Sequence, residues 1–321
     1  MHTYVSYAAA LCTRNIKGVR ALGAVSRRLI AYALAALLAA GAWWAYSALQ
    51  ARRGGERGGL RVAVTFPSLL EDVKAVACEG DVVEPVAPAG VDPHEYQLTP
   101  RDLSMLAESD LIVSTGHTPF EARIAELVRR GELKARLIEL PSIPGIRLLT
   151  NPATGQPNYH MPILDPRNYV AFVRNLTETM AQLRPACAQR YRESGRRIVE
   201  EVEALAARAP RLNVTALGLS PVVQYQVEWM GIHVKYLLVK EHEVPSTPED
   251  IAAAERGLAS GEVKLVVLVR GAEGTPLGAK ARELASRYGV PILYVPSPIG
   301  PEGVLQKIRE AVRGVEELIG K

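Results

Sequence analysis

The chain has 321 residues, enough for about two domains with cores of their own. Its formal net charge of +4 at pH 7 is the sum of +8 on residues 1–61 and −4 on the remainder, so the basic charge belongs to the N-terminus alone. A nucleic-acid-binding protein carries its positive charge on the folded part, and we therefore expect no nucleic-acid partner.

Residues 29–49, LIAYALAALLAAGAWWAYSAL, form a run of 21 residues without a charge. At 1.5 Å per residue such a helix spans about 30 Å, the thickness of the bilayer core. Trp43 and Trp44 near its end are typical of a membrane interface, and the basic residues of segment 1–28 favour a cytoplasmic N-terminus. We predict an uncleaved transmembrane anchor, with a cleaved signal peptide as the alternative, followed by a linker at 50–59 and an extracytoplasmic remainder.

The three cysteines show no metal-ligand spacing. Cys12 precedes the apolar run, which leaves Cys78 and Cys187 on the far side of it. These two either form a disulfide or remain as buried free thiols. No cysteine closely follows the apolar run, so a lipid-modified cysteine is not indicated.

Strand-like and helix-like runs alternate through residues 60–184. The segment TPRDLSMLAES begins with Thr99 as N-cap, Pro100 at the first helical position and Asp102 at the third, which predicts a capped helix. The apolar run DLIVSTG that follows predicts a buried strand. This alternation is typical of a parallel sheet flanked by helices.

The same order of elements returns in residues 211–321. Thr247, Pro248 and Asp250 begin a helix that leads into the strand VKLVVLV, as in the first half. Residues 185–210 lie between the halves, and from about Ala186 to Ala209 they predict one long helix without proline and with Gly195 as its one glycine. We therefore predict an α/β fold of two lobes, each with a parallel sheet, joined by a long rigid helix.

Three histidines fall on loops of the first half. His94 follows the second predicted strand, His117 follows the strand DLIVSTG, and His160 precedes Asp165, the expected N-cap of the next helix. Ligands of open α/β sheets bind at the carboxyl ends of strands, and imidazole is a common ligand of zinc and manganese. The alternative is that each is a solvated loop histidine.

Other polar residues have more ordinary interpretations. Ser220 stands between a strand and a helix like a hydrolase nucleophile, but Val222 replaces the second glycine of that motif, so an N-cap hydroxyl is the better interpretation. His242 with its flanking Glu241 and Glu243 could bind a metal, although a charged loop is the simpler prediction. His233 alternates with apolar residues and is predicted on a strand surface.

From about Leu60 onward the chain resembles the metal-binding solute receptors of ABC importers, the zinc- and manganese-receptor group. The matching segments are AVTFPSLLEDVKAVACEGDVVEPVAPAGVDPHEYQLTPRDLSMLAESDLIVSTG, GIRLLTNPATGQPNYHMPILDPRN, YQVEWMGI and EVPSTPEDI. The resemblance implies that His94 and His160 are the first two metal ligands. It also implies the two-lobe fold with a bridging helix.

The chain departs from the family at the ligands of the second half. The positions that match them hold Ser220 and Ser297, and neutral hydroxyls are poor ligands for Zn²⁺ or Mn²⁺. We expect these serines to line the cleft, with His117, Glu121 or solvent completing the coordination. The alternatives are a degenerate site that binds metal weakly, and one that has lost metal binding and keeps only the scaffold.

The function implied is that of a monomeric extracytoplasmic receptor, which is not an enzyme. It would carry Zn²⁺ or Mn²⁺, or a complex of such a metal, to an ABC permease. The alternatives are a receptor of the same fold for a non-metal ligand, and a hydrolase or chelatase-like enzyme.

Overall fold

The computed structural model describes residues 58–320 except Pro93, His242 and Glu243, together with five isolated residues between 32 and 43. Residues 1–57 and 58–321 are separate compact units, and only the second is described below. The predicted transmembrane segment 29–49 lies almost wholly outside the described residues. Among the helices that are described, none has the length and apolar character needed to span a bilayer.

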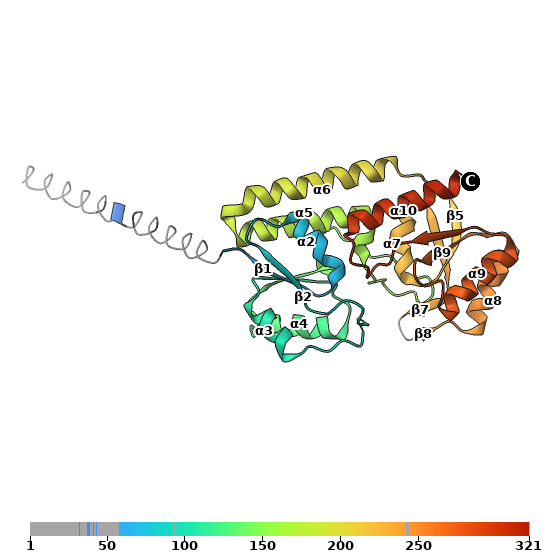
Figure 1. Cartoon of the computed structure of the whole chain (residues 1–321), viewed down its shortest axis with the longest axis horizontal. Helices are drawn as coiled ribbons and strands as arrows, with labels where there is room; N and C mark the ends of the chain where they lie inside the picture. The colour runs from blue at the N-terminus through green and yellow to red at the C-terminus, as the bar shows by residue number, and fades with distance from the viewer. Residues whose placement is uncertain are drawn as a thin grey trace, which may run out of the picture. The chain divides into compact units, whose positions relative to one another are not determined.

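The first sheet contains four parallel strands, β1 (Arg61–Val64), β2 (Val82–Pro85), β3 (Leu111–Ser114) and β4 (Arg136–Glu139), in the order β2-β1-β3-β4. Successive side chains of β1 enter different cores. Val62 and Val64 pack with helices α2 (Leu70–Val76), α5 (Pro166–Leu183) and α6 (Ala188–Arg208), whereas Ala63 packs with α3 (Pro100–Glu108) and α4 (Pro119–Arg129). The sheet is therefore covered on both faces, as a parallel sheet requires (Figure 1). We call this sheet and its helices the first lobe. The helical segments are η1 (Pro67–Leu69), α2 (Leu70–Val76), α3 (Pro100–Glu108), α4 (Pro119–Arg129) and η2 (Leu140–Ser142).

The second sheet repeats this topology with β5 (Val214–Gly218), β6 (Ile232–Leu237), β9 (Val263–Val269) and β10 (Ile292–Val295), all parallel, in the order β10-β9-β5-β6. A small antiparallel pair, β7 (Val239–Glu241) and β8 (Val244–Pro245), lies beside it. We call this part the second lobe. Its helical segments are η5 (Pro221–Val223), α7 (Gln224–Val227), η6 (Glu228–Met230), α8 (Pro248–Ala259), α9 (Pro276–Tyr288) and α10 (Val304–Ile319). The two parallel sheets flanked by helices confirm the predicted fold class.

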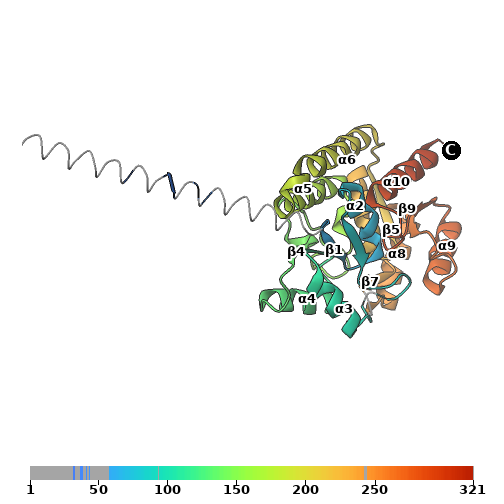
Figure 2. The same cartoon turned by 60° about the vertical axis from the view of Figure 1, so that its left-hand side comes forward.

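Two long helices connect the lobes, with η3 (Pro162–Leu164) leading into the first and η4 (Pro185–Cys187) standing between them. Helix α5 (Pro166–Leu183) packs along α6 (Ala188–Arg208), and α6 extends from the first lobe toward α10 (Figures 1 and 2). Near one end of α6 the Tyr191 hydroxyl donates to Asp81 of the first lobe, and near the other Glu201 pairs with Arg309 of α10. The connecting helix thus contacts both lobes along its length.

A disulfide joins Cys78, just after α2, to Cys187 at the start of α6. The sequence left the bonded and the free-thiol states open, and the structure shows the bonded one. The bond attaches the connecting helix to the first lobe.

The helix starts show where local sequence is sufficient. Thr99 with Asp102 and Thr247 with Asp250 both form the predicted capping boxes, in which each side chain binds the other residue's backbone N–H. The prediction for Ser220 was wrong: its side chain makes no capping hydrogen bond. The helix there begins as a 3₁₀ turn, and the N–H of Val223 donates to the carbonyl of Ser220 instead.

Candidate metal centre

Both sheets have a topological switch point, because the second strand of each lobe lies on one side of the first and the third strand on the other. In such sheets the carboxyl ends of the two central strands leave a crevice that binds ligands. The pocket described below is lined by residues that follow β1, β2 and β3 in the first lobe and β5, β6 and β10 in the second. The topology alone therefore directs these loops toward one site.

His94 and His117 come from neighbouring loops of the first sheet. His94 lies beyond β2 in a turn in which its backbone N–H donates to Asp92 Oδ1 at 2.9 Å. His117 lies three residues after β3, and Gly116 between them has a φ of +75°, the left-handed region that favours glycine. A Cβ at Gly116 would also lie 2.9 Å from Pro141 Cδ, so the tight turn that presents His117 depends on this glycine.

His160 lies on the long connection between β4 and α5. Its backbone N–H donates to Asn158 Oδ1 at 3.0 Å, the same two-residue arrangement as at His94. The next residue, Met161, has a φ of +50°, a conformation that costs a non-glycine residue about 1 kcal/mol or more. Backbone strain of this kind often marks a functional site.

The three imidazoles converge. One nitrogen from each of His94, His117 and His160 can be chosen so that all three lie within 4.8 Å of one another. The ring centroids are 5.4 Å apart for His94 and His117, 6.3 Å for His94 and His160, and 5.3 Å for His117 and His160. Zinc–nitrogen bonds of about 2.0 Å in tetrahedral geometry require nitrogens about 3.3 Å apart, so small side-chain rotations would close the set around one ion.

A carboxylate from the second lobe lies beside the cluster, next to His160. Glu241, the last residue of β7, places Oε1 2.9 Å from His160 Nε2. From the sequence, His242 with Glu241 and Glu243 could bind a metal, but a charged loop was the simpler prediction for the run KEHE. Neighbouring residues do not distinguish a carboxylate that faces a cleft from one that faces solvent.

The pocket around these residues has a volume of about 290 Å³. Ser220 lines it, as expected, but on the far wall the lining residues are Pro298 and Ile299, and Ser297 is not among them. Glu121 is also outside the lining, because it is buried behind His117. Of the four additional residues proposed from sequence, the structure therefore brings His117 and Ser220 to the pocket.

Glu121 is fully occupied by hydrogen bonds. Its carboxylate accepts from the hydroxyls of Ser114, Thr115 and Thr118 and from the backbone N–H groups of Thr115, Thr118 and His117, at 2.7–3.1 Å. Burial would raise the pKa of Glu121, but hydrogen bonds from Thr65 and Thr115 hold it below its ordinary value. This carboxylate shapes the loop that carries His117.

The same loop prepares the His117 ring. Burial lowers the pKa of His117 to about 4, although the Glu121 carboxylate opposes this, so the imidazole is neutral at pH 7. Its Nδ1 lies 3.0 Å from Thr115 Oγ1, whose own hydrogen is donated to Glu121. The hydroxyl therefore accepts from Nδ1–H, and Nε2 keeps the lone pair that binds a metal.

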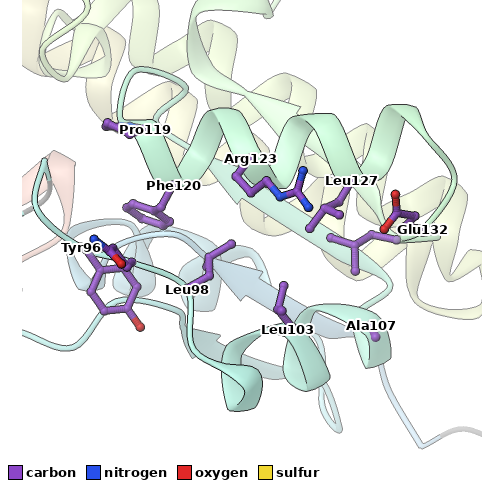
Figure 3. Close-up of a pocket in the computed structure, with 11 residues that line it drawn as sticks. Tyr96, Leu98, Leu103, Ala107, Pro119, Phe120, Arg123, Leu127 and Glu132 are labelled. Atoms are coloured by element: carbon purple, nitrogen blue, oxygen red, sulfur yellow. The ribbon is translucent and has the colours of Figure 1, made fainter.

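A second hollow of about 610 Å³ lies between α3 and α4. Phe120 and Leu127 of α4 reach toward Leu98 and toward Leu103 of α3 (Figure 3). No histidine lines this hollow and its one carboxylate is Glu132, so it lacks the donors of a transition-metal site.

Comparison with known proteins agrees with this geometry. Residues 62–306 match the family described as ZnuA, zinc-uptake complex component A, periplasmic. The chain belongs to this family. The match includes both sheets, the three histidines of the cluster and Glu241.

The sequence identity to the following relatives is low. The iron-binding protein YfeA of Yersinia pestis is 23% identical over 253 residues, which are 76% of this chain and 79% of YfeA. The manganese ABC transporter substrate-binding lipoprotein PsaA of Streptococcus pneumoniae serotype 4 is 21% identical over 234 residues, 68% of this chain and 74% of PsaA. Among solved structures, the substrate-binding protein FpvC of Pseudomonas aeruginosa in complex with Mn²⁺ has a TM-score of 0.65 at 20% identity, covering 81% of this chain and 99% of FpvC. At such identity the structural match shows the fold.

Proposed function

We propose that this member of the ZnuA family is an extracytoplasmic receptor that captures a divalent transition metal with His94, His117, His160 and Glu241 and delivers it to an ABC permease. The observation that carries the proposal is the convergence within 4.8 Å of three imidazoles from separate loops of the first half of the chain. The family's description as a zinc-uptake component supports the same function. So do the relatives named an iron-binding protein and a manganese ABC transporter substrate-binding lipoprotein.

The donor set favours zinc over manganese. Three imidazole nitrogens and one carboxylate oxygen suit the tetrahedral preference of Zn²⁺, whereas Mn²⁺ prefers more oxygen ligands. All three histidines belong to the first half of the chain, and among the described residues of the second lobe Glu241 is the charged donor beside them. In this proposal His117 and Glu241 take the place of the two family ligands whose positions hold Ser220 and Ser297.

The Cys78–Cys187 disulfide supports an oxidising, extracytoplasmic location. Attachment to the membrane through residues 29–49 remains a prediction, as do the monomeric state and the absence of catalytic activity. The relative PsaA is named a lipoprotein, whereas this chain has no cysteine close behind its apolar run.

The test is metal binding by the full-length protein after chelation, with Zn²⁺ and Mn²⁺ titrated separately and the bound metal measured by elemental analysis. We expect one Zn²⁺ per chain, weaker binding of Mn²⁺, and loss of both in the double variant His94→Ala/His160→Ala. His233→Ala is the matched control, because the His233 side chain is 59% exposed on β6. A wild-type protein that retains no metal at micromolar concentration would refute the proposal.

A further inference from the structure

The connection that carries His160 is attached to both lobes. We call residues 147–162 the His160 arm. At its base Asn168 of α5 accepts from the N–H of Arg147 and donates to the carbonyls of Arg147 and Pro162, at 2.8–2.9 Å. Between these ends, Thr150 and Pro157 form an isolated antiparallel bridge that closes the arm into a narrow loop.

Beyond this base the arm is held by the second lobe. The Tyr225 hydroxyl accepts from the N–H of Leu149 at 2.9 Å and donates to the carbonyl of Asn158 at 2.5 Å. Asn151 Nδ2 donates to the carbonyl of Lys240 at 2.7 Å. Tyr225 and Asn151 are fully buried, so these bonds are shielded from water. His160 follows the first lobe in sequence but is positioned by the second.

The side chain of Asn158 links this attachment to the ligand. Asn158 is fully buried, and its Nδ2 donates to the carbonyl of Pro221 and to Gln224 Oε1, both at 2.8 Å. Gln224 Nε2 in turn donates to the carbonyl of Thr150 at 3.1 Å. Backbone carbonyls can only accept, so both amides have one allowed orientation.

This orientation determines where His160 carries its hydrogen. Asn158 Oδ1 lies 3.0 Å from His160 Nδ1 and has no hydrogen to donate, so Nδ1 must be the protonated nitrogen. Nε2 faces the pocket and lies 2.9 Å from Glu241 Oε1, which accepts a hydrogen from Nε2 while no metal is bound. A metal ion would take the place of that Nε2 hydrogen, whereas the Nδ1 hydrogen would stay on Asn158, and outer hydrogen bonds of this kind orient ligand histidines.

We infer that Asn158 and Gln224 are positioning residues through which the second lobe holds the tautomer and orientation of His160 for metal binding. The expected effect on metal affinity rests on the proposed function, whereas the expected tautomer of His160 does not. His94 provides the internal comparison. Asp92 accepts from the backbone N–H of His94 in the same way as Asn158 does from that of His160. Asp92, however, is exposed and has no amide hydrogens with which to bind the second lobe.

The experiment compares three variants in the full-length protein. Asn158→Leu removes both the acceptor for Nδ1–H and the donors to the second lobe. Asn158→Asp keeps the acceptor and removes the donors. Gln224→Met removes one acceptor of the Asn158 amide and leaves His160 itself untouched. Asp92→Asn is the comparison for the ring hydrogens, because it keeps an oxygen for the N–H of His94. His233→Ala is the control for zinc binding, because the His233 side chain is exposed and lies outside the pocket lining.

The first measurement is the ¹⁵N chemical shift of the His160 ring nitrogens in metal-free protein. We expect Nδ1 to be protonated in the wild type, in Asn158→Asp and in Asp92→Asn, and to lose its proton in part of the molecules in Asn158→Leu. Rescue by aspartate distinguishes a hydrogen-bonding role from simple packing. An unprotonated Nδ1 in the wild type would overturn the inference whether or not the protein binds metal.

The second measurement is Zn²⁺ affinity and dissociation rate. We expect Asn158→Leu to bind about 10–100-fold more weakly, the usual effect of losing an outer hydrogen bond to a ligand. Asn158→Asp and Gln224→Met should release Zn²⁺ faster than the wild type, and His233→Ala should match the wild type. Wild-type affinity and release in all of the Asn158 and Gln224 variants would refute the inference, whereas a wild type without Zn²⁺ binding would refute the proposed function instead. Asn158→Asp and Gln224→Met keep the test decisive if Asn158→Leu does not fold.

Discussion

Replacing His117 by alanine tests the proposed histidine ligand that the resemblance to the family does not itself imply. Four-ligand zinc sites bind with about 10–16 kcal/mol, so one of four donors is worth about 3 kcal/mol. This corresponds to a loss of about 100-fold in affinity. The hydrogen bonds that Glu121 accepts come from backbone N–H groups and from hydroxyls, which the variant retains. The fold should therefore survive the change.

The assay is a competition titration of Zn²⁺ against a chromophoric chelator, with circular dichroism to confirm the folded state. His233→Ala, which removes an exposed histidine from β6, should bind Zn²⁺ as the wild type does. If His117→Ala is folded and its affinity is within a factor of about three of the wild-type value, His117 is not a ligand. The three-imidazole site would then be incorrect.

Three further predictions concern stability, each measured by urea unfolding. Glu121→Gln should lower the free energy of unfolding by about 2–4 kcal/mol, because an amide nitrogen would face donors in a buried network; an unchanged midpoint would contradict this. Burial raises the pKa of Asp72 to about 6 from 3.8. The stability associated with the protonated Asp72 carboxyl is therefore fully present below pH 3.8 and is lost as the pH rises through about 6. Between pH 4 and 6 the free energy of unfolding of the wild type should fall by up to about 3 kcal/mol more than that of Asp72→Asn. The same pH dependence in both proteins would argue against this. Cys187→Ser should cost about 4 kcal/mol, because the Cys78–Cys187 bond closes a loop with a sequence separation of 109, and dithiothreitol should no longer destabilise this variant.

Local features of the fold followed from the sequence alone. The capping boxes at Thr99 and Thr247 each need only a partner three residues away, Asp102 and Asp250, so a short stretch contains all the atoms involved. The alternation of strand and helix patterns likewise predicted the parallel sheets. Because carboxyl ends of parallel strands share an edge, the same pattern directed His94 and His117 to one crevice.

The loop positions brought out all three histidines, the resemblance to metal receptors singled out His94 and His160 as ligands, and the structure places His160 beside the other two. The sequence did not predict whether a side chain points into the pocket or away from it. Glu121 was expected near the cleft but is the buried centre of a hydrogen-bond network, and Ser297 is replaced on the pocket wall by its neighbours Pro298 and Ile299. One or two residues along a loop reverse the direction of a side chain, and sequence spacing does not resolve that difference.

Only the tertiary structure decided which distant residues meet. The contact of His160 with Glu241, the bond from Tyr225 to Asn158 and the disulfide of Cys78 join residues 81, 67 and 109 positions apart, respectively. A capping box is recognisable because its partners lie within one helical turn, whereas each of these contacts depends on how elements far apart in the sequence pack together. The sequence thus determined the elements and the loops that bear imidazoles, and packing of the lobes determined which oxygens and amides surround those rings.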